Sequence, residues 1–484
     1  MAFVILLSFL TYFYRYAYPP HVYWDENYHI ASAQKYLNGV YFMEQHPPLG
    51  KMLAALGEKI LSPNEKTDQF LTTDYGTDFP ADFSFAGYRF FSALLGWLTA
   101  PLLFLIFLLL TRNNLVSSLL SFFYIFDNGL IVHLRGAMLE GPLLFFCTLF
   151  LLLFFLALEL KEDPKKFTWL SILLGVSFAL ILTTKVLGLI FILFFGAFAL
   201  TLLPDFARIA KFAVLSFFGF VVVYCGVWYI HFASGSRIVP ELPDNGYYQA
   251  SAQYKNILAV QKNKSPAAFP VMLRDSLKYV SHYNNGAPRL DLCKDDENGS
   301  PFFLWPLGAR TINYRWETPG NGSYRYLYLQ SNPVVWLSAF ASVLLAICFL
   351  VGSFFFRLQE PLKNPYLLSI FTGTYIAYMI AVSRIDRVLY LYHYFIPLLF
   401  SFIIFALVFM EIRNIGKWRV TEWQKTIGLM VLAAFIFAAH QFFRPLTYYE
   451  PITDSQFKKR EWLGVWELSC VRCQKVSPLV IPTK

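Results

Sequence analysis

Charged residues, cysteines and nucleotide-binding motifs are all scarce in this sequence. Only 15% of its 484 residues are charged, whereas ordinary soluble domains have about 25%. The sequence contains neither the glycine-rich fingerprint of dinucleotide-binding domains nor a P-loop. These absences argue against a soluble protein and against an enzyme built on either nucleotide-binding motif.

Apolar residues dominate instead. They make up 57% of the chain and include 51 phenylalanines. Long apolar runs such as residues 101–110 recur, and together they exceed what one soluble core can bury. We therefore predict a polytopic membrane protein in which lipid surrounds most of the chain.

The basic balance of the chain has a topological explanation. The formal net charge is +9, which in a soluble protein would suggest a nucleic-acid partner. In membrane proteins, however, an excess of Lys and Arg usually marks loops that stay in the cytoplasm. We therefore expect membrane lipid, and no nucleic acid, among the partners.

The six cysteines give little indication of function. Half lie in apolar segments, and the only close pair is the C-x-x-C at Cys470 and Cys473. Without a second pair or a histidine at ligand spacing, this motif indicates metal binding or redox chemistry only weakly. An ordinary tail or a local disulfide is the alternative interpretation.

Eleven segments are apolar and long enough to be predicted as membrane-spanning helices of about 20 residues each. The first lacks a small-residue cleavage site and is predicted to be retained. Long polar segments occupy residues 19–85 and 233–332, and a polar tail covers 444–484. The predicted spans are 1–18, 86–110, 115–133, 137–158, 168–184, 186–204, 211–232, 333–356, 366–382, 391–410 and 426–443.

The short loops predict the orientation of these spans. One set is rich in Lys and Arg and is expected to face the cytoplasm. Both long polar segments and the tail then lie on the opposite side, outside the cell or in a lumen. The basic residues of the cytoplasmic set are Arg112, Lys161, Lys165, Lys166, Arg208, Lys211, Arg357, Lys363, Arg413, Lys417, Arg419 and Lys425.

Four basic residues lie in the opposite, outer turns, where the charge bias does not require them. Ionisable groups at the ends of membrane helices are costly and tend to mark a functional site. Snorkelling of these side chains to the headgroups is the alternative. The four residues are Arg135, Lys185, Arg384 and Arg387.

A polar island follows the first span, and an acidic pair lies at its start. Asp25 and Glu26 are expected at the boundary between water and lipid. Neighbouring side chains in an extended segment point to opposite sides, so we expect the two carboxylates to have different roles. One would act as a base and the other would orient a partner, with plain solvation of both as the alternative.

Two short helices are predicted in the same island. The first covers residues 31–39 and ends at Gly39, which suits a C-cap. The second lies within residues 46–61, where two prolines fix the entry and an apolar stripe begins at Leu49. We expect this second helix to lie on the membrane surface with His46 at its start.

Six regions of the sequence, in order, resemble the protein O-mannosyltransferase family, whose members have the type-C glycosyltransferase fold. In that family an Asp-Glu pair is followed by His-Pro-Pro-Leu-Gly-Lys in the first outer loop. The regions are YWDENYH with HPPLGKML (23–29 and 46–53), LRGAMLEGPLLFF (134–146), LTTKVLGL (182–189), SPFFLWPLGARTINYRW (300–316), LQSNPVVWL (329–337) and YLYHYFIPLLF (390–400).

The sequence departs from the family pattern at a few points. Glu44 stands where the family commonly has Asp, and Ser331 stands where it has Gly. The second outer segment has roughly 100 residues, which is too short for the β-trefoil domain that eukaryotic relatives carry there. This length predicts a bacterial-type member in the plasma membrane, with its site on the outer face.

The resemblance implies an inverting enzyme that moves a hexose, usually mannose, from a polyprenyl-phosphate carrier to Ser or Thr hydroxyls of exported proteins. It implies Asp25 as the base, with Glu26 orienting the acceptor or a basic neighbour. The implied phosphate-binding cations are Arg135, Lys185, Arg384, Arg387 and Arg15, because phosphate gains charge as it leaves. The implied sugar-binding or acceptor-binding residues are His46, Glu44, Glu140, His393, Tyr392 and Trp305.

Other interpretations stay open at this stage. Some type-C enzymes hold a divalent metal near the acidic pair, but no ligand cluster is evident here. Transfer of a lipid-linked sugar to lipid A or a cell-wall polymer is the main alternative function. A transporter would place its charges at the bilayer midplane between internal repeats, and an inert scaffold would leave the outer cations unexplained.

Overall fold

The computed structural model describes residues 1–71, 79–239, 242, 246–294, 296–320, 322–356 and 360–469, and they are mostly helical. Eight of the helices in these ranges are long and apolar enough to cross a membrane, or nine if one bent pair is counted as a span. A helix coincides with each of the eleven predicted segments, which supports the predicted class of polytopic membrane protein. Arg357, Cys470 and Cys473 lie outside the described ranges.

The chain forms two compact units. Unit 1 contains Met1–Tyr12, Trp97–His133 and Pro288–Lys484, and unit 2 contains Phe13–Gly96 and Leu134–Ala287. The helices α4 (Ala86–Thr111) and α7 (Asn128–Leu134) run across the boundaries between these ranges. Each unit is described by itself below.

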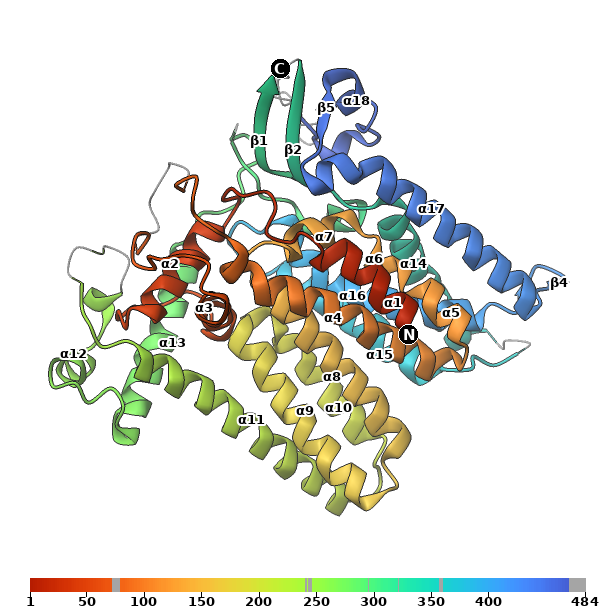
Figure 1. Cartoon of the computed structure of the whole chain (residues 1–484). Coiled ribbons are helices and arrows are strands. Elements are labelled where there is room, and N and C mark those ends of the chain that lie inside the picture. The colour runs from red at the N-terminus through yellow and green to blue at the C-terminus, as the bar shows by residue number, and fades with distance from the viewer. Residues whose placement is uncertain are drawn as a thin grey trace. The chain divides into compact units, whose positions relative to one another are not determined.

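Unit 2 is built around a group of long apolar helices. In Figure 1, α8 to α11 lie side by side in the yellow part of the chain, and α9 packs against both α8 and α11. The helices are α2 (Glu26–Leu37), α3 (Leu49–Leu61), α8 (Glu140–Leu160), α9 (Pro164–Thr184), η2 (Val186–Phe191), α10 (Ile192–Leu200), α11 (Phe206–Ser234), η3 (Tyr247–Gln249), α12 (Ala252–Ala259), η4 (Pro266–Ala268) and α13 (Phe269–Gly286).

Glycines allow α9 and α11 to approach closely. A Cβ added to Gly175 would collide with the backbone of Ser216, and one added to Gly219 would collide with the backbone of Ile172. At the same crossing the Ser216 hydroxyl donates to the carbonyl of Ser171 at 2.9 Å. Small residues commonly bring membrane helices together in this way, because lipid gives little hydrophobic drive for their association.

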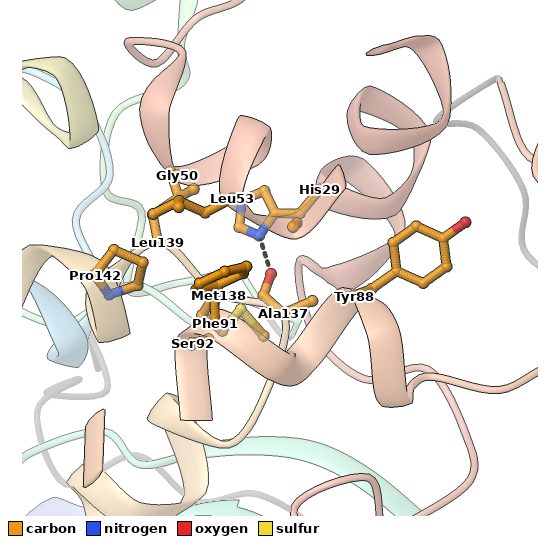
Figure 2. A pocket seen from close by; sticks show the side chains of 11 residues that line it. His29, Gly50, Leu53, Tyr88, Phe91, Ser92, Ala137, Met138, Leu139 and Pro142 are labelled. Atoms are coloured by element: carbon orange, nitrogen blue, oxygen red, sulfur yellow. Dashed lines mark hydrogen bonds between the residues drawn. The ribbon is translucent and has the colours of Figure 1, made fainter. Parts of the chain in front are cut away.

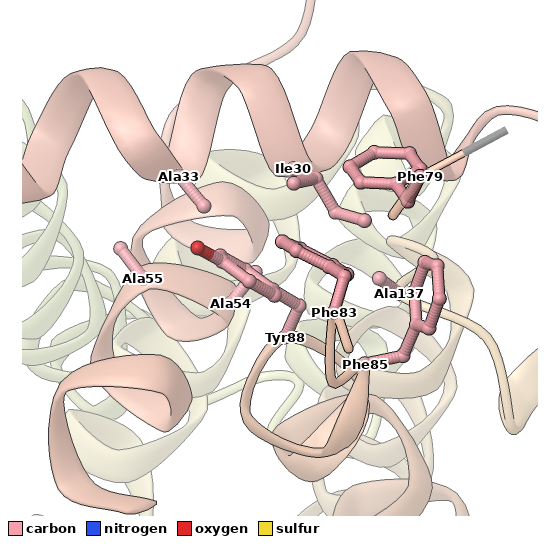
Figure 3. Packing of buried hydrophobic residues seen from close by; sticks show 9 residues of the cluster. All are labelled: Ile30, Ala33, Ala54, Ala55, Phe79, Phe83, Phe85, Tyr88 and Ala137. Atoms are coloured by element: carbon pink, nitrogen blue, oxygen red, sulfur yellow. The ribbon is translucent and has the colours of Figure 1, made fainter. Parts of the chain in front are cut away.

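The polar island after the first span folds as two helices, as predicted. Helix α2 is longer than the predicted 31–39 and already begins at Glu26. Gly39 follows it with a φ of +62°, a left-handed conformation that glycine adopts at little cost. Figure 3 shows the aromatic and aliphatic cluster that packs between α2, α3 and the start of α4.

The apolar stripe of α3 points away from this cluster. Small residues such as Ala54 and Ala55 form its buried side, whereas Leu56 and Ile60 are 42% and 58% exposed. A helix with small residues inside and large apolar residues outside suits a lipid-facing position. The location of α3 on the membrane surface stays a prediction.

Unit 1 combines membrane helices with a small sheet that the sequence analysis missed. Helix α16 packs against α14 and α15, and the strands pair antiparallel in the order β1-β2-β5. The elements are α1 (Ala2–Ser8), η1 (Phe9–Phe13), α5 (Asn114–Leu120), α6 (Phe122–Ile125), η5 (Phe302–Leu307), β1 (Ile312–Gly320), β2 (Ser323–Leu329), α14 (Pro333–Phe355), α15 (Pro365–Val382), η6 (Leu391–Tyr394), α16 (Phe395–Glu411), β3 (Asn414–Ile415), β4 (Trp418–Arg419), α17 (Glu422–Tyr448), β5 (Pro451–Thr453), α18 (Asp454–Lys458) and η7 (Gly464–Trp466).

The predicted span 115–133 is broken rather than straight, with a bend of 63° between residues 114–125 and 128–134. Asp127 lies at the break and is fully buried. Its carboxylate accepts from the backbone N–H of Leu130 at 2.8 Å and from the indole of Trp336 at 2.8 Å. Asn332 donates to the carbonyls of Phe126 at 2.9 Å and Ile436 at 3.0 Å. The bonds to Leu130 N–H and the Phe126 carbonyl satisfy backbone groups at the break, and the bond to Ile436 ties Asn332 to α17.

Candidate active site

The core of the site in unit 2 is a buried ion pair between Glu26 and Arg89. Glu26 opens α2 and Arg89 lies near the start of α4, and both side chains are fully buried. Arg89 donates to the two carboxylate oxygens at 2.6 and 2.7 Å, a bidentate geometry with high directional specificity. The backbone N–H of Ala137 donates to the same carboxylate at 2.8 Å.

Arg89 also fastens the segment that precedes the acidic pair. Its remaining donors bond the carbonyls of Ala17, Pro19 and His21 at 2.6 to 2.7 Å. Its guanidinium lies over the rings of Tyr23 and Phe85, 4.7 and 4.4 Å from their centroids. One side chain therefore holds α2, α4 and the chain after the first helix in fixed register.

These contacts change the role predicted for Glu26. Its oxygens are engaged with Arg89 and backbone N–H groups, so it is not available to an acceptor. Of the two predicted roles, orienting a basic neighbour fits and orienting the acceptor does not. The prediction of an extended pair is also wrong, because Asp25 is the N-cap residue of α2 and Glu26 is its first residue.

Asp25 is the more accessible member of the pair. It is partly exposed, and its side chain makes no capping bond to α2. Trp24, just before it, has a φ of +51°, a conformation that is uncommon for a bulky residue. The firmly bonded Glu26 on one side and this turn on the other constrain the backbone at Asp25.

Arg135 lies in the same neighbourhood as the acidic pair. Burial raises the pKa of Tyr23, the charge of Glu26 raises it further, and Arg89 and Arg135 oppose the shift. A Cβ on Gly136 would lie 2.9 Å from the Tyr23 hydroxyl. The guanidinium of Arg135 donates to the carbonyl of Arg15 at 2.6 Å, and this bond orients it.

Arg15 itself is placed differently from its prediction. It is exposed, and its guanidinium carbon lies 5.5 Å from the ring centroid of Tyr18. Its backbone carbonyl, rather than its guanidinium, makes the bond to Arg135. Phosphate binding by the Arg15 guanidinium stays a prediction.

A buried histidine lies beside the ion pair. Figure 2 shows His29 of α2 with its Nδ1 2.6 Å from the carbonyl oxygen of Ala137, at the edge of a small cavity also lined by Gly50, Leu53 and Ser92. Burial lowers the pKa of His29 well below its usual value, and the positive charge of Lys51 adds to this effect. His29 is therefore neutral near pH 7, with Nδ1–H donating to the Ala137 carbonyl and Nε2 able to act as an acceptor.

Two further ion pairs surround His29. Lys51 of α3 pairs with Glu44, which also accepts from the hydroxyl of Ser32 at 3.0 Å. Lys185, in the break after α9, pairs with Glu140 at the start of α8. The charges of Glu140 and His46 both act on His29.

Unit 2 thus brings together most of the predicted site residues. The members that it contains are Arg15, Asp25, Glu26, Glu44, His46, Arg135, Glu140 and Lys185. Unit 1 contains the others, which are Trp305, Arg384, Arg387, Tyr392 and His393.

The aromatic residues predicted in unit 1 form a stack. His133, Tyr392 and His393 follow one another with ring centroids 4.7 Å apart at each step. Trp305 continues the stack, is fully buried and donates its indole N–H to the carbonyl of Ser300 at 3.1 Å. Full burial does not fit the prediction that Trp305 contacts a sugar or acceptor, and it indicates a structural role.

His393 and the two predicted arginines of unit 1 differ in exposure. The Nδ1 of His393 lies 3.1 Å from the backbone nitrogen of Tyr390 and closes the first turn of η6. Arg384 is exposed and Arg387 is half-buried, in the segment between α15 and η6. A nearby link in unit 1 joins Val388 N–H to the carbonyl of Pro288 at 2.8 Å.

The residues around Asp25 do not fit a divalent metal. No group of three or more His, Cys, Asp or Glu side chains suited to an ion occurs within the described ranges. Glu26, the second carboxylate of the pair, has its oxygens bonded to Arg89 and Ala137. No step of the mechanism below uses a metal.

Sequence reasoning missed Arg89, His29 and Lys51. Arg89 stands in the first turn of an otherwise apolar span, and an ionisable residue in such a place is itself a signal of function or of a buried partner. His29 and Lys51 lie within the motifs YWDENYH and HPPLGKML. In this region only the carboxylates and His46 were predicted as site residues.

An apolar groove in unit 2 adjoins two of these site residues in sequence. It has a volume of about 180 Å³. Val186 in its wall follows Lys185 directly, and Pro47 follows His46. The groove is lined by Pro47, Leu182, Val186, Leu189, Tyr224, Trp228, Leu277 and Val280.

Comparison with solved structures defines the class of protein. The structure matches that of the Saccharomyces cerevisiae protein O-mannosyltransferase Pmt1-Pmt2 complex bound to the sugar donor, with a TM-score of 0.80 and 16% identity over 97% of this chain and 92% of that chain. It also matches the apo oligosaccharyltransferase of Archaeoglobus fulgidus, with a TM-score of 0.52 and 11% identity over 95% and 57% of the two chains. The chain is an integral membrane protein with the type-C glycosyltransferase fold.

Two family models cover most of the sequence. The model described as dolichyl-phosphate-mannose-protein mannosyltransferase matches residues 2–234. The model of the C-terminal four TMM region of protein-O-mannosyltransferase matches residues 278–466. The chain belongs to the protein O-mannosyltransferase family, as its motifs predicted.

Curated relatives match part of the chain. Protein O-mannosyl-transferase 2 of Danio rerio is 33% identical over 198 residues, which cover 40% of this chain and 26% of the relative. Dolichyl-phosphate-mannose–protein mannosyltransferase 1 of Schizosaccharomyces pombe is 31% identical over 169 residues, 34% of this chain and 19% of the relative. The matched region thus spans about a quarter or less of the length of these relatives.

Proposed function

We propose that this chain is an inverting glycosyltransferase that moves mannose from a polyprenyl-phosphate carrier to Ser or Thr hydroxyls of exported proteins. The observation that carries the proposal is the accessible carboxylate of Asp25, held by the buried Glu26–Arg89 pair in the neighbourhood of Arg135. In this arrangement Asp25 would be the base for the attacking hydroxyl, and Arg135 would be the cation that stabilises the leaving phosphate.

Asp25 is the proposed general base. A Ser or Thr hydroxyl is a weak nucleophile until its proton is removed. The acceptor oxygen attacks the anomeric carbon of the sugar while its proton passes to the Asp25 carboxylate. Attack from the face opposite the leaving group inverts the anomeric centre.

The proposed role of the cations is to stabilise the leaving phosphate. The bond between the anomeric carbon and the phosphate oxygen breaks, and its electron pair stays on the phosphate. Arg135 suits two parallel bonds to phosphate oxygens, whereas Lys185 acts as a point charge. Since the phosphate gains charge in the transition state, these cations favour that state over the bound donor.

The apolar groove is proposed to hold the first isoprene units of the carrier. Its walls are apolar, and Val186 in one wall is the sequence neighbour of Lys185, a proposed phosphate-binding residue. Burial of a hydrocarbon tail next to a cation suits a lipid phosphate better than a nucleotide sugar.

The proposed site faces the non-cytoplasmic side of the membrane. The charge bias of the short loops supports this orientation. The second outer segment contains α12, α13 and the β1–β2 hairpin among its described residues, and its length supports a bacterial plasma membrane as the location.

The test of function is a transfer assay with purified protein. Labelled mannosyl polyprenyl phosphate and a Ser/Thr-rich peptide are incubated with the protein, and the product is identified by mass. We expect the hexose on peptide hydroxyls. Label on lipid A or on a cell-wall polymer, with none on peptide, would replace the proposed acceptor, and no transfer to any acceptor would refute the activity.

Filling the groove should weaken binding of long-chain donors. We expect Leu182→Trp to raise KM about tenfold for a donor with a long polyprenyl tail, which corresponds to about 1.4 kcal/mol. A mannosyl phosphate donor without any isoprene unit should be affected little, and it serves as the internal control. Equal effects on the two donors would show that the groove does not hold the tail.

A further inference from the structure

The segment that follows α11 is strongly basic. Residues 246–290 contain six Lys and Arg but a single acidic residue, Asp275. Asp275 is buried and pairs with Arg274 at 3.3 Å. Lys262, Lys264 and Lys278 are exposed, so the described surface of this segment carries an excess of positive charge.

On α13 the basic side chains form a row. Arg274, Lys278 and His282 recur at every fourth residue and are all exposed, so they lie on one side of the helix. Met272 and Ser276 are buried on another side, where α13 packs with α11 and α12 in one hydrophobic cluster.

Apolar side chains are interleaved with these cations. Val260, Leu277 and Tyr283 are 51%, 45% and 42% exposed. A solvated basic surface has no need of such residues, whereas an interfacial surface combines inserted apolar groups with cations at headgroup level.

Two hydrogen bonds fix the depth of this surface relative to the span α11. The Tyr229 hydroxyl donates to the carbonyl of Lys264 at 2.8 Å, and the Asn263 amide donates to the carbonyl of Phe232 at 2.8 Å. Tyr229 lies five residues before the last residue of α11, Ser234, or about 8 Å along the helix axis. The backbone at Lys264 is therefore held against the last turns of a membrane-spanning helix, where lipid headgroups are found.

We propose that α12, α13 and the connection between them form a docking surface for anionic phospholipid headgroups, in the leaflet at the Ser234 end of α11. The lysines bind the phosphates, and Val260 and Tyr283 enter the acyl boundary. This inference does not depend on the transferase activity. The interleaved apolar residues and the fixed depth favour lipid over an acidic protein as the partner.

The test measures amide hydrogen exchange of the whole chain in two kinds of nanodisc. One contains phosphatidylcholine alone, and the other contains phosphatidylcholine with 30% phosphatidylglycerol as the anionic probe. Each basic side chain near an anionic surface contributes roughly a fivefold change in affinity. We expect exchange in residues 257–283 to slow at least about threefold in the anionic discs, and this protection to fall at high salt.

A charge-matched pair of variants assigns the effect to this surface. Lys262→Glu/Lys264→Glu should abolish the lipid-dependent protection. Arg289→Glu/Lys294→Glu changes the net charge equally, but these cations already face Asp386 at 3.4 Å and Asp296 at 3.1 Å, so the protection should remain. Exchange in α8 and α9 reports whether each variant is folded.

Several outcomes would overturn the proposal. Identical exchange of the wild-type protein in both kinds of disc would do so, and this arm needs no variant to fold. Equal loss of protection in the control variant would do so as well. Protection by a soluble acidic peptide, but not by phosphatidylglycerol, would assign the surface to a protein partner instead.

Discussion

Asp25→Asn is expected to lower kcat by a factor of roughly 10² to 10⁴, the range typical for loss of a general base. The variant keeps the size and hydrogen-bonding ability of the side chain but cannot accept the acceptor's proton at neutral pH. Its stability should match that of the wild type, because Asp25 is partly exposed and does not cap α2. Initial rates at saturating donor and peptide, together with thermal unfolding in detergent, measure the two quantities.

Asp68→Asn is the matched control for this experiment. It neutralises an exposed carboxylate in the same outer segment, and it should leave the rate unchanged. A wild-type rate for Asp25→Asn would show that Asp25 is not the base. If Asp68→Asn lowered the rate as much as Asp25→Asn does, the loss of negative charge, rather than of one particular carboxylate, would be responsible.

Breaking the Glu26–Arg89 pair should have the largest effect on stability. Glu26→Ala leaves a buried arginine without its carboxylate, which typically costs about 3 to 5 kcal/mol. Arg89→Ala should cost at least as much, because it also leaves three backbone carbonyls without their donor. Arg89→Lys should rescue little, because an ammonium cannot reproduce the fork geometry of the guanidinium.

A double-mutant cycle distinguishes this pair from two independent residues. The effects of Glu26→Ala and Arg89→Ala on unfolding in detergent should be strongly non-additive, with the double variant well short of the sum. Additivity within about 0.5 kcal/mol would contradict the coupling that the geometry implies. Glu26→Gln, which keeps an acceptor oxygen for Arg89 and Ala137, should be the mildest change at this position.

The membrane helices and the acidic motif of this chain could be predicted because each depends on a local signal. Apolar runs of sufficient length predict the membrane spans. The motif YWDENYH followed by HPPLGK indicates which outer segment contributes the acidic residues of the candidate site. The partner of Glu26 could not be predicted in this way. Arg89 is 63 residues away in sequence. Its place in an apolar span signals a buried partner, but no local feature identifies Glu26 as that partner.

The sheet and the broken span were missed for a different reason. Tyr324, Tyr326 and Tyr328 alternate along β2 and are all buried, which is the period of a strand with one covered face. In a sequence so rich in aromatics, three alternating tyrosines do not stand out as the signal of a strand. The break at Asp127 was missed because it depends on residues far away in the sequence. A carboxylate within an apolar run needs hydrogen-bond donors, and Asn332 and Trp336 supply two of them.

The close crossing of α9 and α11 has a consequence for the width of the apolar groove between them. Leu182 and Tyr224 stand on these two helices, a few residues beyond the crossing at Gly175 and Gly219. Because the two glycines have no Cβ, the helices approach closely, and this approach sets the distance between the groove walls at Leu182 and Tyr224. A Gly219→Ala change would move the helices, and with them the walls, apart. The width of the groove proposed for the carrier tail would then depend on two glycines that do not line it.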